Sequence, residues 1–128
     1  MRPDSLDHVA LFVRDIARST AWYRDVLGLE RRHEEAWGDD PVVLVARDGA
    51  SGVALFPARS AASVPDERAP RVFAHLAFRV GGAALRQATG ELAARGIPFE
   101  EQDHGIARSV YVRDPDGHQV ELTTYEVG

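Results

Sequence analysis

Two histidines and one glutamate occupy matching positions in two similar stretches of this chain. The first stretch opens at His8 and the second at His75, each within a run of alternating apolar residues. Ala54 follows His8 by 46 residues, and Glu121 follows His75 by the same 46 residues. The corresponding positions therefore hold His, Ala, His and Glu. Two imidazoles and one carboxylate leave coordination positions open, which is the ligand set of a catalytic metal site.

The elements that must position these ligands repeat in the same order. The sequence predicts, in the first copy, a strand at 6–13, a helix capped by Asp15 and stopped by Gly28, and a hairpin of 42–47 with 52–57. After a polar connector at 58–71, it predicts a strand at 73–80, a helix at 83–95, a short strand near 97–101, a loop at 102–107 and a hairpin of 108–114 with 118–125. We therefore expect one α+β domain over 1–128, made of two βαβββ modules at about 4–58 and 71–126.

Strand alternation assigns the faces of these strands. The faces that carry the ligands also carry Ala10 and Ala77, and small side chains beside ligands leave a hollow. We expect a cup-shaped mixed sheet with the helices on the outside. By the same count, four larger side chains line an apolar, partly aromatic cup: Phe12, Leu44, Phe56 and Tyr111. His118, directly after the turn at 114–117, is expected on the surface.

Composition narrows the classes of function. A net charge of −5 and scattered arginines argue against a nucleic-acid partner, because no basic stripe is present. No apolar run approaches the ~20 residues that span a bilayer, so no membrane partner is expected. The chain has no cysteine, which excludes disulfides and thiolate metal sites. No signal peptide precedes the first strand, and this favours the cytoplasm.

Three segments together resemble a known superfamily. They are Leu6-Asp7-His8-Val9, the helix end at 23–29, and the segment from Asp114-Pro115-Asp116-Gly117 to Leu122. They are similar to segments of the vicinal oxygen chelate superfamily, which includes glyoxalases, bleomycin-resistance proteins, fosfomycin-modifying enzymes and extradiol dioxygenases. The resemblance covers nearly the whole chain. It implies a divalent metal bound by His8, His75 and Glu121, and a small-molecule substrate that chelates the metal.

Within that superfamily, the extradiol dioxygenases match best. The resemblance implies Fe(II), with Mn(II), Zn(II) or Ni(II) as alternatives, and a catechol-like aromatic substrate. Tyr111 matches the tyrosine of these enzymes, and His104 lies in a loop like the one that carries their histidine. Both are expected to be catalytic. Phe12, Phe56 and Ser109 are expected to contact the substrate, and the superfamily commonly forms homodimers.

Two other functions stay open. One is a resistance protein of the bleomycin type, which sequesters a drug or natural product without chemistry. The other is a metal-dependent transferase or lyase. Ala54 lacks the second carboxylate expected of a glyoxalase, and Ala10 lacks the hydroxyl expected of a fosfomycin-modifying enzyme. Retention of all three ligands favours an enzyme of the non-haem dioxygenase type.

Overall fold

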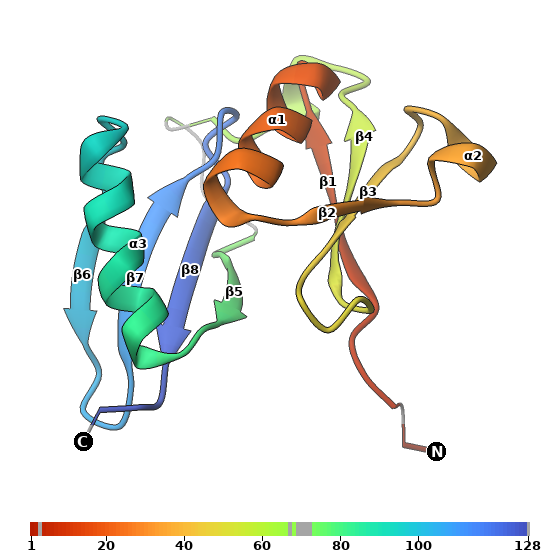
Figure 1. The fold of residues 1–128 in the computed structure, drawn as a ribbon. Coiled ribbons are helices and arrows are strands. Elements are labelled where there is room, and N and C mark those ends of the chain that lie inside the picture. The colour runs from red at the N-terminus through yellow and green to blue at the C-terminus, as the bar shows by residue number, and fades with distance from the viewer. Residues whose placement is uncertain (3, 67, 69–72, 128) are drawn as a thin grey trace. The chain divides into compact units, whose positions relative to one another are not determined.

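The chain folds into two compact units, Met1–Ala69 and Pro70–Gly128, as seen in a computed structural model (Figure 1). The structure describes residues 1–2, 4–66, 68 and 73–127. Each unit has the order strand, helix, three strands, with one short extra helix after the second strand of the first unit, so the predicted α+β class and the two βαβββ modules are confirmed. No helix in the described ranges is long and apolar enough to cross a membrane.

The first unit is a four-stranded mixed sheet with one long helix. Its elements are β1 (His8–Val13), α1 (Ile16–Leu27), β2 (Glu30–Arg32), α2 (Glu34–Trp37), β3 (Val42–Val45) and β4 (Gly52–Pro57), followed by a 3₁₀ turn at Ala61–Ser63. The sheet order is β1-β4-β3-β2, with β1 parallel to β4 and the other pairs antiparallel. The first strand of the module thus pairs with its last strand, and β1 and β2 form the two edges of the sheet.

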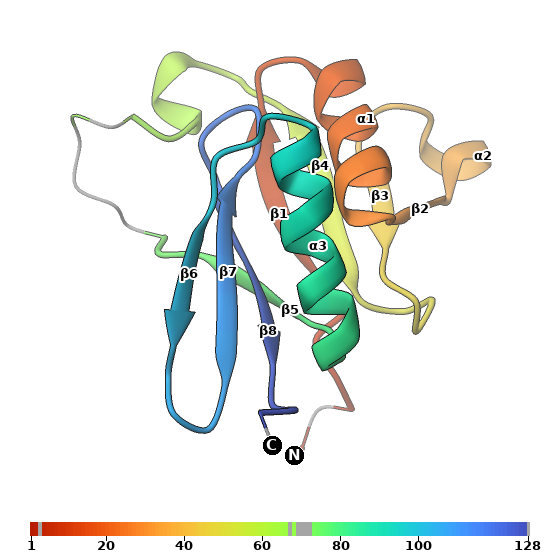
Figure 2. The same cartoon turned by 60° about the vertical axis from the view of Figure 1, so that its left-hand side comes forward.

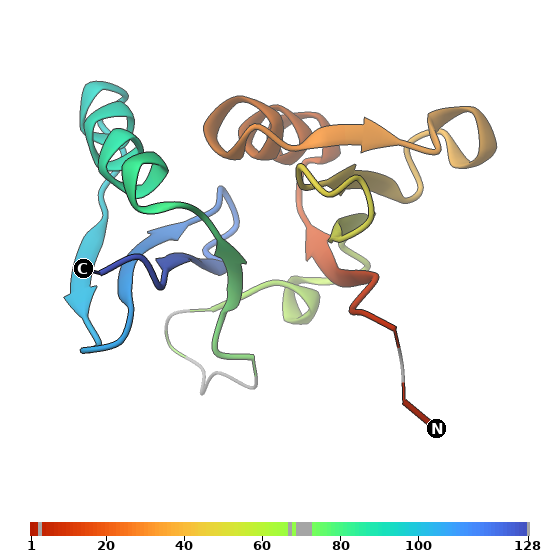
Figure 3. The same cartoon turned by 60° about the horizontal axis from the view of Figure 1, so that its bottom comes forward.

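The second unit repeats this topology. Its elements are β5 (Leu76–Arg79), α3 (Gly82–Ala94), β6 (Glu100–Asp103), β7 (Arg108–Arg113) and β8 (Gln119–Thr124). The sheet order is β5-β8-β7-β6, and β5 runs parallel to β8. Helix α3 packs on β7 and β8, along one face of this sheet (Figures 2 and 3). The other face is the one that carries Glu121.

The long helices begin and end where local chemistry dictates. The Asp15 carboxylate accepts a hydrogen bond from the Arg18 amide at 3.0 Å, and Gly28 adopts φ +68° to end α1. Helix α3 lacks a side-chain cap of its own. Instead the carboxylate of Glu126, after the last strand, accepts a 2.7 Å hydrogen bond from the Gly82 amide at the helix start. This contact ties the end of the chain to the helix.

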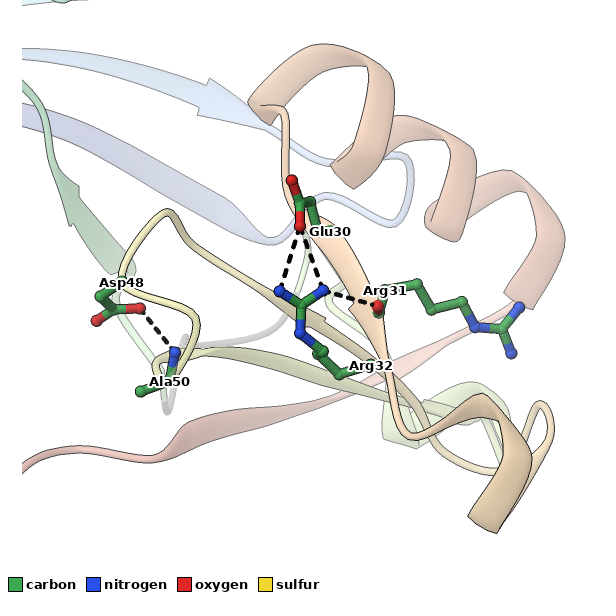
Figure 4. Close-up of polar contacts among 5 residues, drawn as sticks. All are labelled: Glu30, Arg31, Arg32, Asp48 and Ala50. Carbon is green, nitrogen blue, oxygen red and sulfur yellow. Dashed lines mark hydrogen bonds and ion pairs between the residues drawn. The ribbon is translucent and has the colours of Figure 1, made fainter.

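The hairpin of β3 and β4 is held by its turn. Asp48 Oδ1 accepts a hydrogen bond from the Ala50 amide (Figure 4) and another from the Ser51 amide, each at 3.0 Å. These backbone hydrogen bonds, and a further one from the Ser51 hydroxyl, lower the pKa of Asp48. On the neighbouring edge strand, both terminal nitrogens of Arg32 lie 3.2 Å from one Glu30 oxygen (Figure 4).

The core of each unit lies on the sheet face away from the ligand positions. In the first unit it is built around fully buried side chains: Val13, Tyr23, Leu44, Val53 and Leu55. In the second unit it includes Leu85, Leu92, Val110, Val112 and Val120. Burying each large side chain stabilises the fold by ~1.5–3 kcal/mol, so these faces hold the sheets to their helices.

Three sequence expectations need correction. Strand β6 begins at Glu100, not near 97, because Ile97 still bonds to the end of α3: its amide donates to the Leu92 carbonyl. Leu44 does not share the ligand face, since it pairs with Val53 and is fully buried. His118 is only 7% exposed, because the turn bends back through a hydrogen bond from the His118 amide to Asp114.

Candidate metal centre and acid–base pair

The second unit brings two of the predicted metal ligands together. His75 immediately precedes β5, and Glu121 lies in β8, the strand that pairs with β5. His75 Nε2 is 2.9 Å from Glu121 Oε2. Glu121 is 8% exposed, and its burial without neutralisation is costly, so a cation or a hydrogen-bonding partner must compensate its charge.

This spacing suits a shared metal ion. Nitrogen and oxygen ligands bind divalent metals at ~2.1 Å, so two ligands at a right angle lie ~3.0 Å apart. The chemistry also fits, because a neutral imidazole and a carboxylate are ligands that ferrous iron accepts. Over the residues that the structure describes, no three His, Cys, Asp or Glu side chains form a group that could hold a metal.

The third predicted ligand, His8, opens β1 of the first unit. Its Nδ1 lies 2.7 Å from Asp7 Oδ2, and the His8 side chain is 46% exposed. A carboxylate that accepts the Nδ1 proton leaves Nε2 as the free lone pair, which is the form of histidine that binds metals. The contact with Asp7 thus orients the His8 ring within its own unit.

A second pair of side chains adjoins Glu121. Tyr111 in β7 lies directly opposite Glu121 in the register of the hairpin. Its hydroxyl is 3.0 Å from Nε2 of His104, which lies in the loop between β6 and β7. The Tyr111 ring also meets His75 edge to face, with ring centres 5.8 Å apart. Both predicted catalytic residues thus lie beside the His75–Glu121 pair.

The environment keeps the Tyr111 hydroxyl protonated. Burial is the largest cause that raises its pKa, and the negative charge of Glu121 adds to it. A tyrosine already titrates near 10, so the raised pKa makes Tyr111 a hydrogen-bond donor over the whole physiological range. Its partner His104 is exposed to solvent.

The structure separates the three predicted substrate contacts. In the first unit, Phe12 and Phe56 are paired across β1 and β4, with ring centres 6.4 Å apart. Phe12 is 38% exposed, so this sheet face presents an aromatic surface. Ser109, in contrast, is 2% exposed, and its hydroxyl donates to Glu121 Oε1 at 2.6 Å. Sequence reasoning placed Ser109 at the site but missed its bond to Glu121, which depends on a side-chain rotamer.

The two units present different chemistry at equivalent positions. Where the second unit has Glu121 and Tyr111, the first has Ala54 and Val43, which pair in the same way. Ala54 is 2% exposed and cannot bind a metal. The first unit thus presents an apolar face and one histidine, and the second unit presents the carboxylate and the tyrosine hydroxyl.

Comparison with known proteins agrees with these features. Residues 5–122 match the family described as the Glyoxalase/Bleomycin resistance protein/Dioxygenase superfamily. A biphenyl-2,3-diol 1,2-dioxygenase of Rhodococcus globerulus is 34% identical over 91% of this chain, which spans only 61% of that enzyme's length. The glutathione transferase FosA of Serratia marcescens is 27% identical over 92% of this chain, and the match covers 79% of the FosA chain.

Solved structures show the same fold. A glyoxalase/dioxygenase from Nostoc punctiforme superposes with a TM-score of 0.80 at 23% identity, covering 94% of this chain and 90% of its own. A lactoylglutathione lyase from Agrobacterium tumefaciens gives a TM-score of 0.71 at 23% identity, with 97% and 96% covered. The family model shows the family, and the relatives carry the names of different activities, so no single reaction is identified. The chain belongs to the Glyoxalase/Bleomycin resistance protein/Dioxygenase superfamily.

Proposed function

We propose that this protein is an extradiol-type dioxygenase that acts on a catechol-like aromatic substrate. Its metal, Fe(II) in this proposal, is held by His8, His75 and Glu121. The observation that carries the proposal is the His104–Tyr111 pair, because its 3.0 Å contact lies beside the carboxylate that pairs with His75. The 34% identity to a biphenyl-diol dioxygenase supports the same reaction class.

Each residue has a distinct task in this proposal. When bound, the ferrous ion would supply the redox chemistry with dioxygen and would bind two neighbouring oxygens of the substrate. His104 Nε2 accepts the proton that the substrate hydroxyl loses, and later returns it. The Tyr111 hydroxyl donates a hydrogen bond to the substrate oxygen on which negative charge develops. The aromatic face of Phe12 and Phe56 packs against the substrate ring.

The metal is the first point to test. The protein purified without oxygen is expected to hold about one iron per chain, measured by mass spectrometry. His75→Ala should lose that iron, because it removes a ligand. His33→Asn is the matched control: His33 is exposed and has φ 63°, a conformation that asparagine tolerates. Full iron content in His75→Ala, or no iron in the wild type after reconstitution, contradicts the proposed ligands.

The reaction is tested by oxygen uptake with a series of catechols. His104→Ala should lower kcat by ~10²–10⁴, the usual contribution of a positioned acid–base group, with little change in KM. Tyr111→Phe keeps the ring and removes the donor, so it should also act mainly on kcat. Equal losses in substrate affinity and turnover for His104→Ala contradict its catalytic role.

A second candidate is a metal-dependent transferase, favoured by the 27% identity to FosA over nearly the whole chain. It predicts activity with Mn(II) on an electrophilic substrate and no oxygen uptake. Sequestration of a drug predicts tight binding that needs no metal and gives no product.

For assembly we propose a homodimer in the cytoplasm, and light scattering at micromolar concentration measures whether two chains associate.

A further inference from the structure

The carboxylate of Glu121 is held at both oxygens by different groups. Oε2 lies 2.9 Å from His75 Nε2, and Oε1 accepts the 2.6 Å hydrogen bond from Ser109. A distance of 2.5–2.7 Å is typical of a hydroxyl that donates to an ionised carboxylate, the stronger class of hydrogen bond. One oxygen therefore faces the metal ligand His75, and the other is committed to a buried hydroxyl.

The Ser109 hydroxyl is itself constrained. A serine carries one hydroxyl proton, and the short contact directs that proton to Glu121. The Ser109 hydroxyl also makes a longer, 3.1 Å contact to the Thr123 hydroxyl oxygen, and Thr123 in turn donates to the Arg108 carbonyl at 3.5 Å. Ser109 lies opposite Thr123 in the hairpin register and is 2% exposed, which prevents water from replacing it. The rotamer of Ser109 is thereby fixed.

We propose that Ser109 is a positioning residue that makes Glu121 a ligand through one oxygen only. The proposal rests on the metal centre of the proposed function. His8, His75 and one oxygen of Glu121 would hold the metal and leave its other coordination positions to the substrate and dioxygen. If Glu121 bound through both oxygens, fewer positions would remain. The hydroxyl of Ser109 thus sets how many positions the substrates can use.

The proposal is tested with Ser109→Ala in the Co(II)-loaded protein, which does not depend on turnover. X-ray absorption should show one Glu121 oxygen at the metal in the wild type and two in Ser109→Ala. The dissociation constant for Co(II) should rise about 10- to 100-fold, the usual effect of removing a group that orients a metal ligand. Ser63→Ala is the matched control, since the Ser63 hydroxyl bonds only to Ser60 in the described contacts.

A measurement on the metal-free protein distinguishes the role of Ser109 from the proposal that His8, His75 and Glu121 bind a metal. The ¹⁵N chemical shift of His75 Nε2 reports its contact with Glu121, and it should change in Ser109→Ala and not in Ser63→Ala. No Co(II) binding by the wild type overturns the metal centre, and the ¹⁵N shift then still tests whether Ser109 orients the carboxylate. If Ser109→Ala does not fold, Ser109→Cys fills the same space with a weak donor and should change the same quantities. Unchanged coordination, affinity and ¹⁵N shift overturn the proposal.

Discussion

Gly52 is the position at which one added methyl group should do most damage to the first unit. It opens β4, pairs with His8 in β1 and donates its amide to the Asp7 carbonyl at 3.2 Å. A Cβ built on Gly52 collides with the carbonyl oxygen of Leu44 and lies 2.8 Å from Val45 Cα. Both are backbone atoms of a paired strand, so neither can rotate away. Gly52→Ala must therefore separate β3 from β4.

The cost follows from these contacts. Overpacking of a well-packed interior costs ~1–3 kcal/mol, and the strained hydrogen bond to Asp7 adds about 1 kcal/mol. We expect Gly52→Ala to lower the free energy of unfolding by roughly 2–4 kcal/mol. For a chain of this size that lowers Tm by about 10 °C. Because Gly52 pairs with His8, a ligand in the proposed function, the proposed metal binding should weaken as well.

Urea unfolding followed by circular dichroism measures this loss. The matched control is Gly90→Ala in α3, where a Cβ meets nothing within 4 Å. That substitution should instead stabilise the protein by ~0.5–1 kcal/mol, since alanine favours a helix more than glycine does. A Gly52→Ala variant within 0.5 kcal/mol of the wild type, measured beside a stabilised Gly90→Ala, refutes the strand-separation argument.

Three further predictions concern stability and ionisation. Thr20 Oγ1 is buried with no hydrogen-bond partner among the described residues. Thr20→Val should therefore raise the free energy of unfolding, measured in urea, by ~1 kcal/mol. A decrease of that size in the free energy of unfolding would mean that the hydroxyl has a partner. The pKa of Asp48 is lowered, so its contribution is present above the ordinary value of 3.8 and is lost as pH falls through the lowered pKa. The urea midpoint of Asp48→Asn should therefore lie below the wild type at pH 7 and meet it at acid pH, and a gap that persists at acid pH contradicts this. The pKa of Tyr111 is raised, so the stability it supports is present below pH 10 and is lost as pH rises through the raised pKa. The difference in ultraviolet absorbance between the wild type and Tyr111→Phe should show the formation of the Tyr111 phenolate above pH 10. A midpoint at or below pH 10 contradicts the burial of this hydroxyl beside the Glu121 carboxylate.

The sequence predicted the modules because their signals are local or periodic. Asp15 and Gly28 mark the ends of α1, and equal spacing from His8 to Ala54 and from His75 to Glu121 indicated the repeat. Alternation then placed Glu121 on the face away from the core. These features need only the backbone period and the turn chemistry, and both can be deduced from residue types.

The errors arose where one residue or one rotamer decides the outcome. Val43 opposes Ala54, whereas Tyr111 opposes Glu121, so the first hairpin is one residue longer than the second. A shift of one residue turns every side chain of a strand to the other face, and this is why Leu44 is in the core. The buried Ser109–Glu121 contact depends on a side-chain rotamer, and the burial of His118 depends on how its turn folds back. Neither leaves a mark in the sequence pattern.

The parallel pairing of β1 with β4 and of β5 with β8 has a consequence for how such a chain can be divided. Every described strand finds its hydrogen-bonded neighbours within its own unit. A break between the 3₁₀ turn at 61–63 and β5 would sever no strand pairing in either sheet. Each half then keeps every strand pairing of its own sheet, with β1 or β5 as one edge strand. Such a chain can be divided between its two sheets without loss of a strand pairing.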